Sequence, residues 1–288
     1  MKSSIEFIAN FKTSLDPYNG ITIEKNDFPK NILEFEKSIA ILIKETKDKR
    51  NLIWIYVDIK NSDFIPILTK YGFTFHSCNS DYLLLVKVLK QNAIVPNLAN
   101  HTLGVGAVVI NKKNEILLIK EKIRNEYYKL AGGHIDDGEM ISTALSREVF
   151  EETGVVVEFL KIISIGHFYP HQFHKSNLYV LCLAKPKSHK IDVKDKEEIS
   201  EAIWLDLDEM FKRDDIHDYT KAIVKSALRS GGLEKSETPI LNHLKNEFEL
   251  FFVSNVNLLE QKEIETTLNS RTKEEKEVSH SKIISLDF

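Results

Sequence analysis

Hydrophobic positions in the first ninety residues follow two different periods, which predict a mixture of strands and helices. After Asn31, which suits a helix N-cap, apolar residues recur at roughly helical spacing until the charged run 44–50. The predicted elements are a helix after Asn31, a buried strand at 52–59, a short helix at 62–71 that Gly72 ends, and a closing strand pair at 73–78 and 82–89. This β/α segment shows no catalytic constellation of its own.

The stretch 91–100, QNAIVPNLAN, is the most linker-like part of the chain, and the hydrophobic pattern restarts after it. Two apolar runs then flank 111–114 and predict a hairpin. The later elements are strands around 155–163, 178–184 and 202–207 and helices near 208–212 and 217–229, with Gly231 and Gly232 as a stop. We therefore expect three parts: a first β/α domain at 1–95, a second domain at 96–232 and a C-terminal extension at 233–288.

The C-terminal extension combines an apolar stretch with a charged end. LNHLKNEFELFF, at 241–252, predicts a helix, and the run RTKEEKE predicts a solvated, partly disordered end. The apolar side chains suit a docked helix or a subunit contact, which leaves a homodimer open. They are Leu244, Phe248, Phe251 and Phe252.

Composition narrows the class of protein. The 288 residues are 42% hydrophobic and 28% charged, close to ordinary globular usage. A net charge of −4 argues against non-specific binding to the nucleic-acid backbone. Cys78 and Cys182 lie far apart and in no metal or redox spacing, which favours a reducing, cytoplasmic setting. The apolar runs are too short to span a bilayer, so we expect a soluble protein without a membrane partner.

Three glutamates crowd the end of the helix predicted at 141–153. On that helix, Glu148 and Glu152 lie beside the apolar stripe, and Glu151 neighbours both. The stripe is Ile141, Leu145 and Val149. Like charges, the helix dipole and lost hydration all oppose this arrangement, so a cation such as Mg²⁺ or Mn²⁺ is expected there. The alternative is a solvated acidic face paired with Arg147 and lysines.

The spacing around these glutamates reproduces a known signature. The pattern G-x5-E-x7-R-E-U-x-E-E-x-G-U, in which U is aliphatic, is met by Gly133, Glu139, Arg147, Glu148, Val149, Glu151, Glu152, Gly154 and Val155. Its seven non-aliphatic positions match by chance roughly once in 10⁸ to 10⁹ tries. The chain therefore resembles the Nudix hydrolases at every fixed position of their signature.

The resemblance implies a fold, a metal site and a reaction. The family fold is α/β (α+β), an α/β/α sandwich with a mixed sheet. By resemblance, the Mg²⁺ or Mn²⁺ ligands are Glu148, Glu151, Glu152 and the Gly133 carbonyl, while Arg147 and Glu139 brace the loop. The implied reaction is hydrolysis of a nucleoside diphosphate linked to another moiety, in which metal activates water.

The general base in this family often comes from a variable loop outside the signature. Here the acidic stretch KDKEEISEAIW offers Glu197, Glu198 and Glu201, and Glu198 is the first choice. A solvated charged loop before the strand AIWLDL is the alternative for each of them.

The first domain carries a second, more dispersed resemblance. W-x-x-V-x-I, F-I-P, Y-G-F-T-F-H and S-x-Y-L-L-L, followed by H-T-L-G-V-G-A-V-V, look like the N-terminal extension of the fibroblast-growth-factor-antisense type of Nudix protein and of plant ADP-ribose/NADH-type relatives. That extension resembles part of an acetyltransferase domain. The glycine loop that binds acyl-CoA phosphate is missing from the sequence, so no acetyl transfer is expected.

Four residues outside the signature are candidates for substrate binding: Tyr128, His171, His174 and Glu201. The histidines belong to GHFYPHQFHKSNLY, where relatives have a His/Arg-containing loop; a plain surface loop and a metal site are the alternatives. Tyr127 or Tyr128 could stack on a base, or belong to the core.

The leading hypothesis is Mg²⁺-dependent hydrolysis of a nucleotide-derived small molecule, ADP-ribose or NADH first. One alternative is a pyrophosphohydrolase of nucleoside triphosphates or RNA caps. Another is a non-catalytic ligand sensor or interaction module, although a sensor does not need the whole glutamate set.

Overall fold

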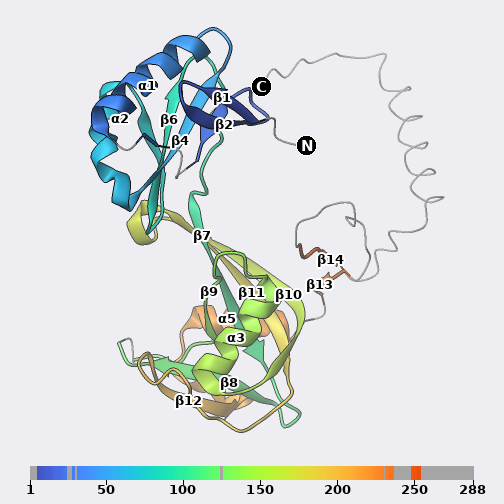
Figure 1. The fold of residues 1–288 in the computed structure, drawn as a ribbon. Coiled ribbons are helices and arrows are strands. Elements are labelled where there is room, and N and C mark those ends of the chain that lie inside the picture. The colour runs from blue at the N-terminus through green and yellow to red at the C-terminus, as the bar shows by residue number, and fades with distance from the viewer. Residues whose placement is uncertain are drawn as a thin grey trace, which may run out of the picture. The chain divides into compact units, whose positions relative to one another are not determined.

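The chain forms two units, and each is built around a mixed six-stranded β-sheet. The computed structural model describes residues 5–24, 28–29, 31–123, 126–229, 231–236 and 248–253. The chain divides into residues 1–99 and residues 100–288, called unit 1 and unit 2 below (Figure 1). Helices long and apolar enough to cross a membrane are absent from the described residues.

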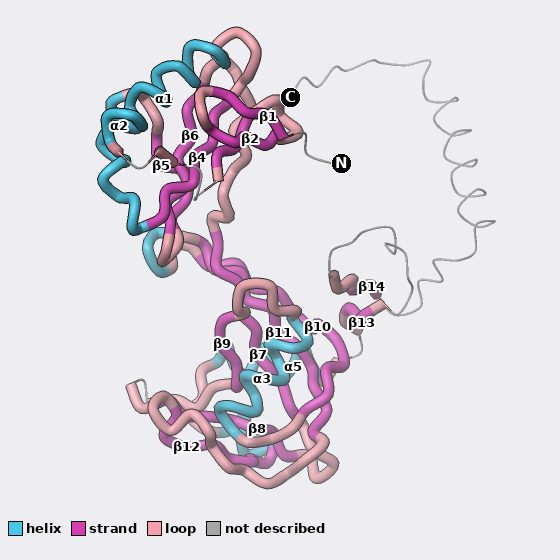
Figure 2. The backbone as a smooth tube through the Cα atoms, in the orientation of Figure 1, coloured by secondary structure: helices cyan, strands magenta, loops and turns pink. Residues whose placement is uncertain are grey.

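Unit 1 is a six-stranded sheet with helices on one face. The strand order is β1 (Ile5–Ile8), β2 (Phe11–Leu15), β3 (Ile21–Ile23), β4 (Leu52–Asp58), β6 (Tyr82–Val88) and β5 (Thr74–Cys78). Its helices are α1 (Ile32–Thr46), the 3₁₀ helix η1 (Ile59–Phe64) and α2 (Ile65–Lys70) (Figure 2). The Asn31 side chain accepts from Glu34 N at 2.8 Å, which confirms the predicted N-cap.

The core of unit 1 follows from the periodicity of α1. Phe35, Ile39 and Leu42 are buried on one stripe and pack with Ile53 and Ile55 of β4. The other face of β4 carries Trp54, against which Ala93 and Val95 of the predicted linker pack. The linker-like stretch therefore covers an apolar face.

Unit 2 holds a mixed six-stranded sheet and a two-stranded sheet. The large sheet runs β14 (Phe251–Val253), β13 (Leu233–Lys235), β10 (Val157–Phe168), β11 (Ser176–Pro186), β7 (His101–Val109) and β9 (Ala131–His134); the small one pairs β12 (Ile199–Asp206) with β8 (Glu115–Glu121). β11 and β7 are parallel, and the other pairs are antiparallel. The helices are α3 (Ile141–Thr153), η2 (Gln172–His174), α4 (Leu207–Lys212) and α5 (Asp218–Ala227).

The two faces of β7 show how unit 2 is layered. Val105 and Ala107 pack in one core cluster with Leu145 of α3. Val108, the residue after Ala107, belongs to the opposite cluster with Ile223 of α5. Helices thus cover both faces of the sheet, and the predicted α/β/α sandwich with a mixed sheet is confirmed.

Two predicted elements turn out differently. Ile110 and Ile116 form one antiparallel bridge, but β7 then pairs with β9 and β11 while β8 pairs with β12, so the expected hairpin does not continue as a ladder. Each strand has an uninterrupted buried run, 104–109 in β7 and 116–119 in β8, so each is covered on both faces and takes neighbours of its own. Phe251–Val253 is a strand where a helix was predicted; the rest of that helix up to 247, including Leu244, lies outside the described residues.

Gly154 ends α3 in a conformation that only glycine takes without cost. Its φ is +73°, and a Cβ atom there would collide with the Asp192 carbonyl. We expect Gly154→Ala to lower the free energy of unfolding by about 2–4 kcal/mol, from left-handed strain plus the collision. Chemical denaturation measures the loss.

Gly138→Ala is the matched control for this prediction. Gly138 has a similar φ of +79°, but nothing lies within 4 Å of a Cβ atom placed there. The control should therefore show the strain alone, about 1–2 kcal/mol. Equal losses in the two variants would contradict a close contact between Gly154 and Asp192.

Candidate metal and pyrophosphate site

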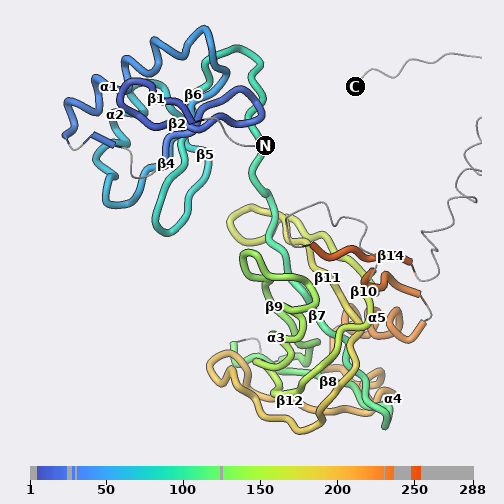
Figure 3. Tube along the Cα trace, turned by 45° about the vertical axis from the view of Figure 1, so that its right-hand side comes forward, coloured from blue at the N-terminus to red at the C-terminus, as the bar shows by residue number. Residues whose placement is uncertain are grey.

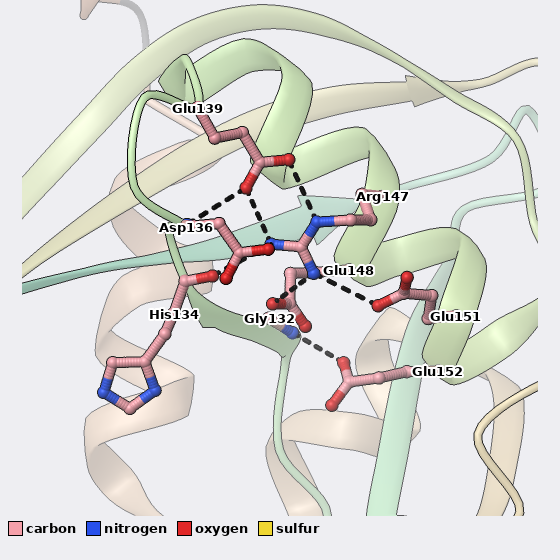
Figure 4. A network of polar contacts seen from close by, with 8 residues as sticks. All are labelled: Gly132, His134, Asp136, Glu139, Arg147, Glu148, Glu151 and Glu152. Carbon is pink, nitrogen blue, oxygen red and sulfur yellow. Dashed lines mark hydrogen bonds and ion pairs between the residues drawn. The ribbon is translucent and has the colours of Figure 1, made fainter. Parts of the chain in front are cut away.

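The acidic cluster is built where α3 crosses the glycines of β9. Pairing with β7 sets Gly132 opposite Gly106 and Gly133 opposite Val105. Glu152 accepts a hydrogen bond from Gly132 N at 2.7 Å (Figure 4). A Cβ atom at Gly133 would lie 2.6 Å from Glu148 Oε2, so a glycine is needed for this carboxylate to rest against the backbone.

Arg147 ties the cluster together. Its guanidinium donates to both oxygens of Glu139, at 2.9 and 2.8 Å, and to the His134 carbonyl at 3.0 Å. It also donates to Glu148 at 2.9 Å and to Glu151 at 3.1 Å, as the dashed lines in Figure 4 show. The hydrogen bonds from Arg147 hold the pKa of Glu139 below its usual value. Arg147 thus joins the loop of Glu139 and the His134 carbonyl to the glutamates of α3.

Glu152 is the most deeply buried acid of the cluster, with 5% of its surface exposed. Burial raises its pKa to about 8, although the charge of Lys129 and the Gly132 N–H act the other way. Burial also raises the pKa of Glu148, against the opposing effect of Arg147. These side chains are hard oxygen donors with too little positive charge beside them, which fits a divalent cation such as Mg²⁺.

The carboxylates of Glu148, Glu151 and Glu152 do not surround a common point in the structure. Across the described ranges, no three His, Cys, Asp or Glu side chains are grouped so that they could hold an ion. Arg147 lies between Glu148 and Glu151, and Glu151 is half-exposed. A cation held by all three glutamates therefore requires Glu151 to turn, which its exposure allows.

A cleft of about 850 Å³ opens beside the cluster. Its lining includes Gly132, Gly133, Lys129, Tyr179, His171 and Glu198. Glu198 comes from the loop before β12, where Asp195 accepts its backbone N–H at 3.0 Å. The charge of Glu198 raises the pKa of both Glu148 and Glu152, after the larger effect of burial, which places it within electrostatic reach of the cluster.

Comparison with known proteins agrees with this geometry. Residues 100–226 match the family model described as the NUDIX domain, and residues 11–89 match a second one described as the Nudix hydrolase domain. Nucleoside diphosphate-linked moiety X motif 6 of Xenopus laevis is 35% identical over 154 residues, which are 52% of this chain and 70% of that protein. The chain belongs to the Nudix hydrolase family.

Further matches differ in how much of each protein the chain covers. Nudix hydrolase 8 of Arabidopsis thaliana is 31% identical over 216 residues, which cover 69% of this chain and only 58% of that protein. A solved Nudix hydrolase from Nitrosomonas europaea is 27% identical, covers 44% of this chain and 87% of that one, and superposes with a TM-score of 0.38.

The predicted substrate residues of this Nudix protein fall into two groups. His171 lines the cleft, whereas His174, Tyr128 and Glu201 are not part of its described lining. Tyr128 is 6% exposed, and its hydroxyl donates to Glu201 at 2.7 Å. This pair holds β12 against the segment before β9. Tyr127 stacks on His217 at 3.8 Å between ring centroids.

Tyr179 is the cleft residue that sequence reasoning missed. Its side chain lies against three glycines: Cβ atoms at Gly104 and Gly106 would come within 2.6 and 2.8 Å of the ring, and one at Gly132 within 2.9 Å of the hydroxyl. Burial raises the pKa of its hydroxyl, so Tyr179 stays a neutral donor at the floor of the cleft. The alternation of glycines in GVG of β7 was the available signal, since strand glycines mark a close approach.

Proposed function

We propose that this chain hydrolyses the pyrophosphate bond of a nucleoside diphosphate linked to a second moiety. The observation that carries the proposal is that the partly buried carboxylate of Glu148 and the buried one of Glu152 lie against Gly133 and Gly132, two residues that line a ligand-sized cleft. Glu148, Glu151 and Glu152, with the Gly133 carbonyl, would hold a divalent ion, which would neutralise charge on the pyrophosphate. Mg²⁺ suits these donors best, and Mn²⁺ can replace it.

The remaining chemistry belongs to side chains of the chain itself. Glu198 takes the proton of the attacking water at its carboxylate, since it faces the cleft and the cluster. Arg147 keeps Glu148 and Glu151 in place. Tyr179 donates from the floor, and His171 contacts the substrate from the wall.

ADP-ribose and NADH are the proposed first substrates. The motifs of unit 1 support this choice, because they resemble the extension of ADP-ribose/NADH-type relatives, and a cleft of about 850 Å³ has room for a dinucleotide. For unit 1 we propose an acetyltransferase-like fold without acetyl transfer.

A substrate panel tests the proposal. The purified chain with Mg²⁺ is offered ADP-ribose, NADH, NAD⁺, diadenosine polyphosphates, deoxynucleoside triphosphates and capped RNA, and products are separated by chromatography. We expect AMP with ribose 5-phosphate from ADP-ribose, or AMP with reduced nicotinamide mononucleotide from NADH. If no substrate in the panel is hydrolysed while calorimetry shows that Mg²⁺ still binds, the proposed enzymatic activity is refuted and a ligand sensor is favoured.

His171 and His174 offer a matched pair for substrate contact. His171 lines the cleft, and its Nδ1 is shielded from solvent without a hydrogen-bond partner among the described residues, whereas His174 is exposed on the same loop. We expect His171→Ala to raise KM about tenfold, the cost of one lost hydrogen bond to a charged ligand, with little change in kcat. His174→Ala should leave KM within about twofold. A larger effect at His174 would contradict the assignment.

A further inference from the structure

The helix that carries the acidic cluster begins without a cap of its own. Met140 occupies the N-cap position of α3 with extended backbone angles, and its side chain makes no capping hydrogen bond. The first turn contains no acidic residue. The first N–H groups of any helix lack partners within it, so an outside acceptor is required if they are shielded from water.

Glu249 supplies that acceptor from more than a hundred residues away. Its carboxylate accepts from Ser142 N at 3.3 Å and from the Ser142 hydroxyl, and Lys235 Nζ lies 2.9 Å from it. The Glu249 side chain is only 4% exposed. Burial alone would raise its pKa, but the bonds from Ser142 and Lys235 hold the pKa below the usual value, so the carboxylate stays charged at the positive end of the helix.

A small sheet extension brings Glu249 to this place. β13 pairs with β10, and β14, labelled in Figure 3, pairs with β13. In this pairing Lys235 lies opposite Phe251. Ser236 N donates to Leu250 O at 2.7 Å, next to Glu249. Phe251 packs on Phe159 of β10, with ring centroids 5.5 Å apart. The segment 248–253 is therefore anchored to the same sheet on which α3 rests.

We propose that Glu249 caps the N-terminus of α3 from outside the helix and that segment 248–253 acts as a strap that positions the acidic cluster. α3 is then held at both ends, by Glu249 at its start and by the close packing of Gly154 against Asp192 at its end. Side chains that bind metal and substrate must be held within about 0.5 Å of their working positions. A loosely held first turn would let α3 move and would displace Glu148 and Glu152 further along the same helix. The kinetic part of this inference rests on the proposed function; the structural part does not.

Hydrogen exchange on the full-length chain tests the cap directly. We expect Glu249→Ala to speed exchange of the amides of residues 142–144 about tenfold, the effect of losing one cap. The concentration of Mg²⁺ that gives half-maximal activity should rise about threefold to tenfold. Glu234→Ala is the control, because Glu234 is an exposed glutamate on β13, the strand that pairs with β14 of the strap. Unchanged exchange in Glu249→Ala, or equal changes in both variants, would overturn the cap.

A second substitution separates capping from general loss of packing. Met140→Ser places a local N-cap on backbone that already has the extended conformation, φ −83° and ψ 150°. We expect it to restore slow exchange and the Mg²⁺ response in Glu249→Ala, but to add little to the wild-type chain. Equal effects of Met140→Ser in both backgrounds would overturn the proposal. If hydrogen exchange confirms the cap but the chain cleaves no substrate, the proposed function is refuted and the cap is not.

Discussion

Glu152→Gln should abolish nearly all turnover, lowering kcat by about 10³-fold or more, while the chain stays folded. The carboxylate is a proposed metal ligand, and the metal contributes several kcal/mol of transition-state stabilisation, with each 1.4 kcal/mol worth tenfold in rate. Folding should survive because glutamine keeps an oxygen that can accept from Gly132 N, now bonded at 2.7 Å. A neutral amide also avoids the cost of a buried charge at a site with 5% exposure.

Three measurements decide this prediction: the rate with Mg²⁺, the Mg²⁺ affinity by calorimetry, and the unfolding midpoint. Glu158→Gln is the control, because Glu158 is an exposed acid on β10 whose charge pairs with Lys187 outside the cleft. We expect normal rates in the control and weakened Mg²⁺ binding only in Glu152→Gln. Wild-type rates in Glu152→Gln would remove Glu152 from the site and with it the metal assignment.

The helix and the contacts of its charged side chains were predictable because their signal is local. Leu145 and Val149 recur at helical spacing, and the structure buries both in α3 at the predicted range Ile141–Thr153. Glu152 follows Leu145 by two turns, so its position beside the buried stripe also follows from the helical period. The contacts of Arg147 with Glu139 and Glu151 span only eight and four residues.

Contacts between distant segments could not be predicted in the same way. Tyr128 and Glu201 lie 73 residues apart, and the local sequence of neither segment predicts their hydrogen bond. The approach of Glu249 to Ser142 spans 107 residues and depends on a strand pairing that the apolar pattern of 241–252 does not specify. An apolar run can be a helix or a strand, and its neighbours in the sheet decide which.

Glu198→Gln is expected to lower kcat by about 10²- to 10⁴-fold, the usual contribution of a general base, with Mg²⁺ affinity nearly unchanged. Glu198 faces the cleft, and its charge is felt by both Glu148 and Glu152. Its backbone N–H is held by Asp195 at 3.0 Å, which orients the loop. Unlike Glu152→Gln, this variant should bind Mg²⁺ and substrate normally and fail in the chemical step, which single-turnover kinetics can show.

Two neighbouring glutamates make the comparison specific. Glu197 also lines the cleft, but its charge is not among the main influences on Glu148 or Glu152, so Glu197→Gln should cost less than about fivefold in kcat. Glu201 is committed to Tyr128 at 2.7 Å, so Glu201→Gln should act on stability more than on rate. A greater loss at Glu197 would move the base by one residue along the loop. Small, equal losses in all three variants would mean that the proton leaves through a group outside this loop.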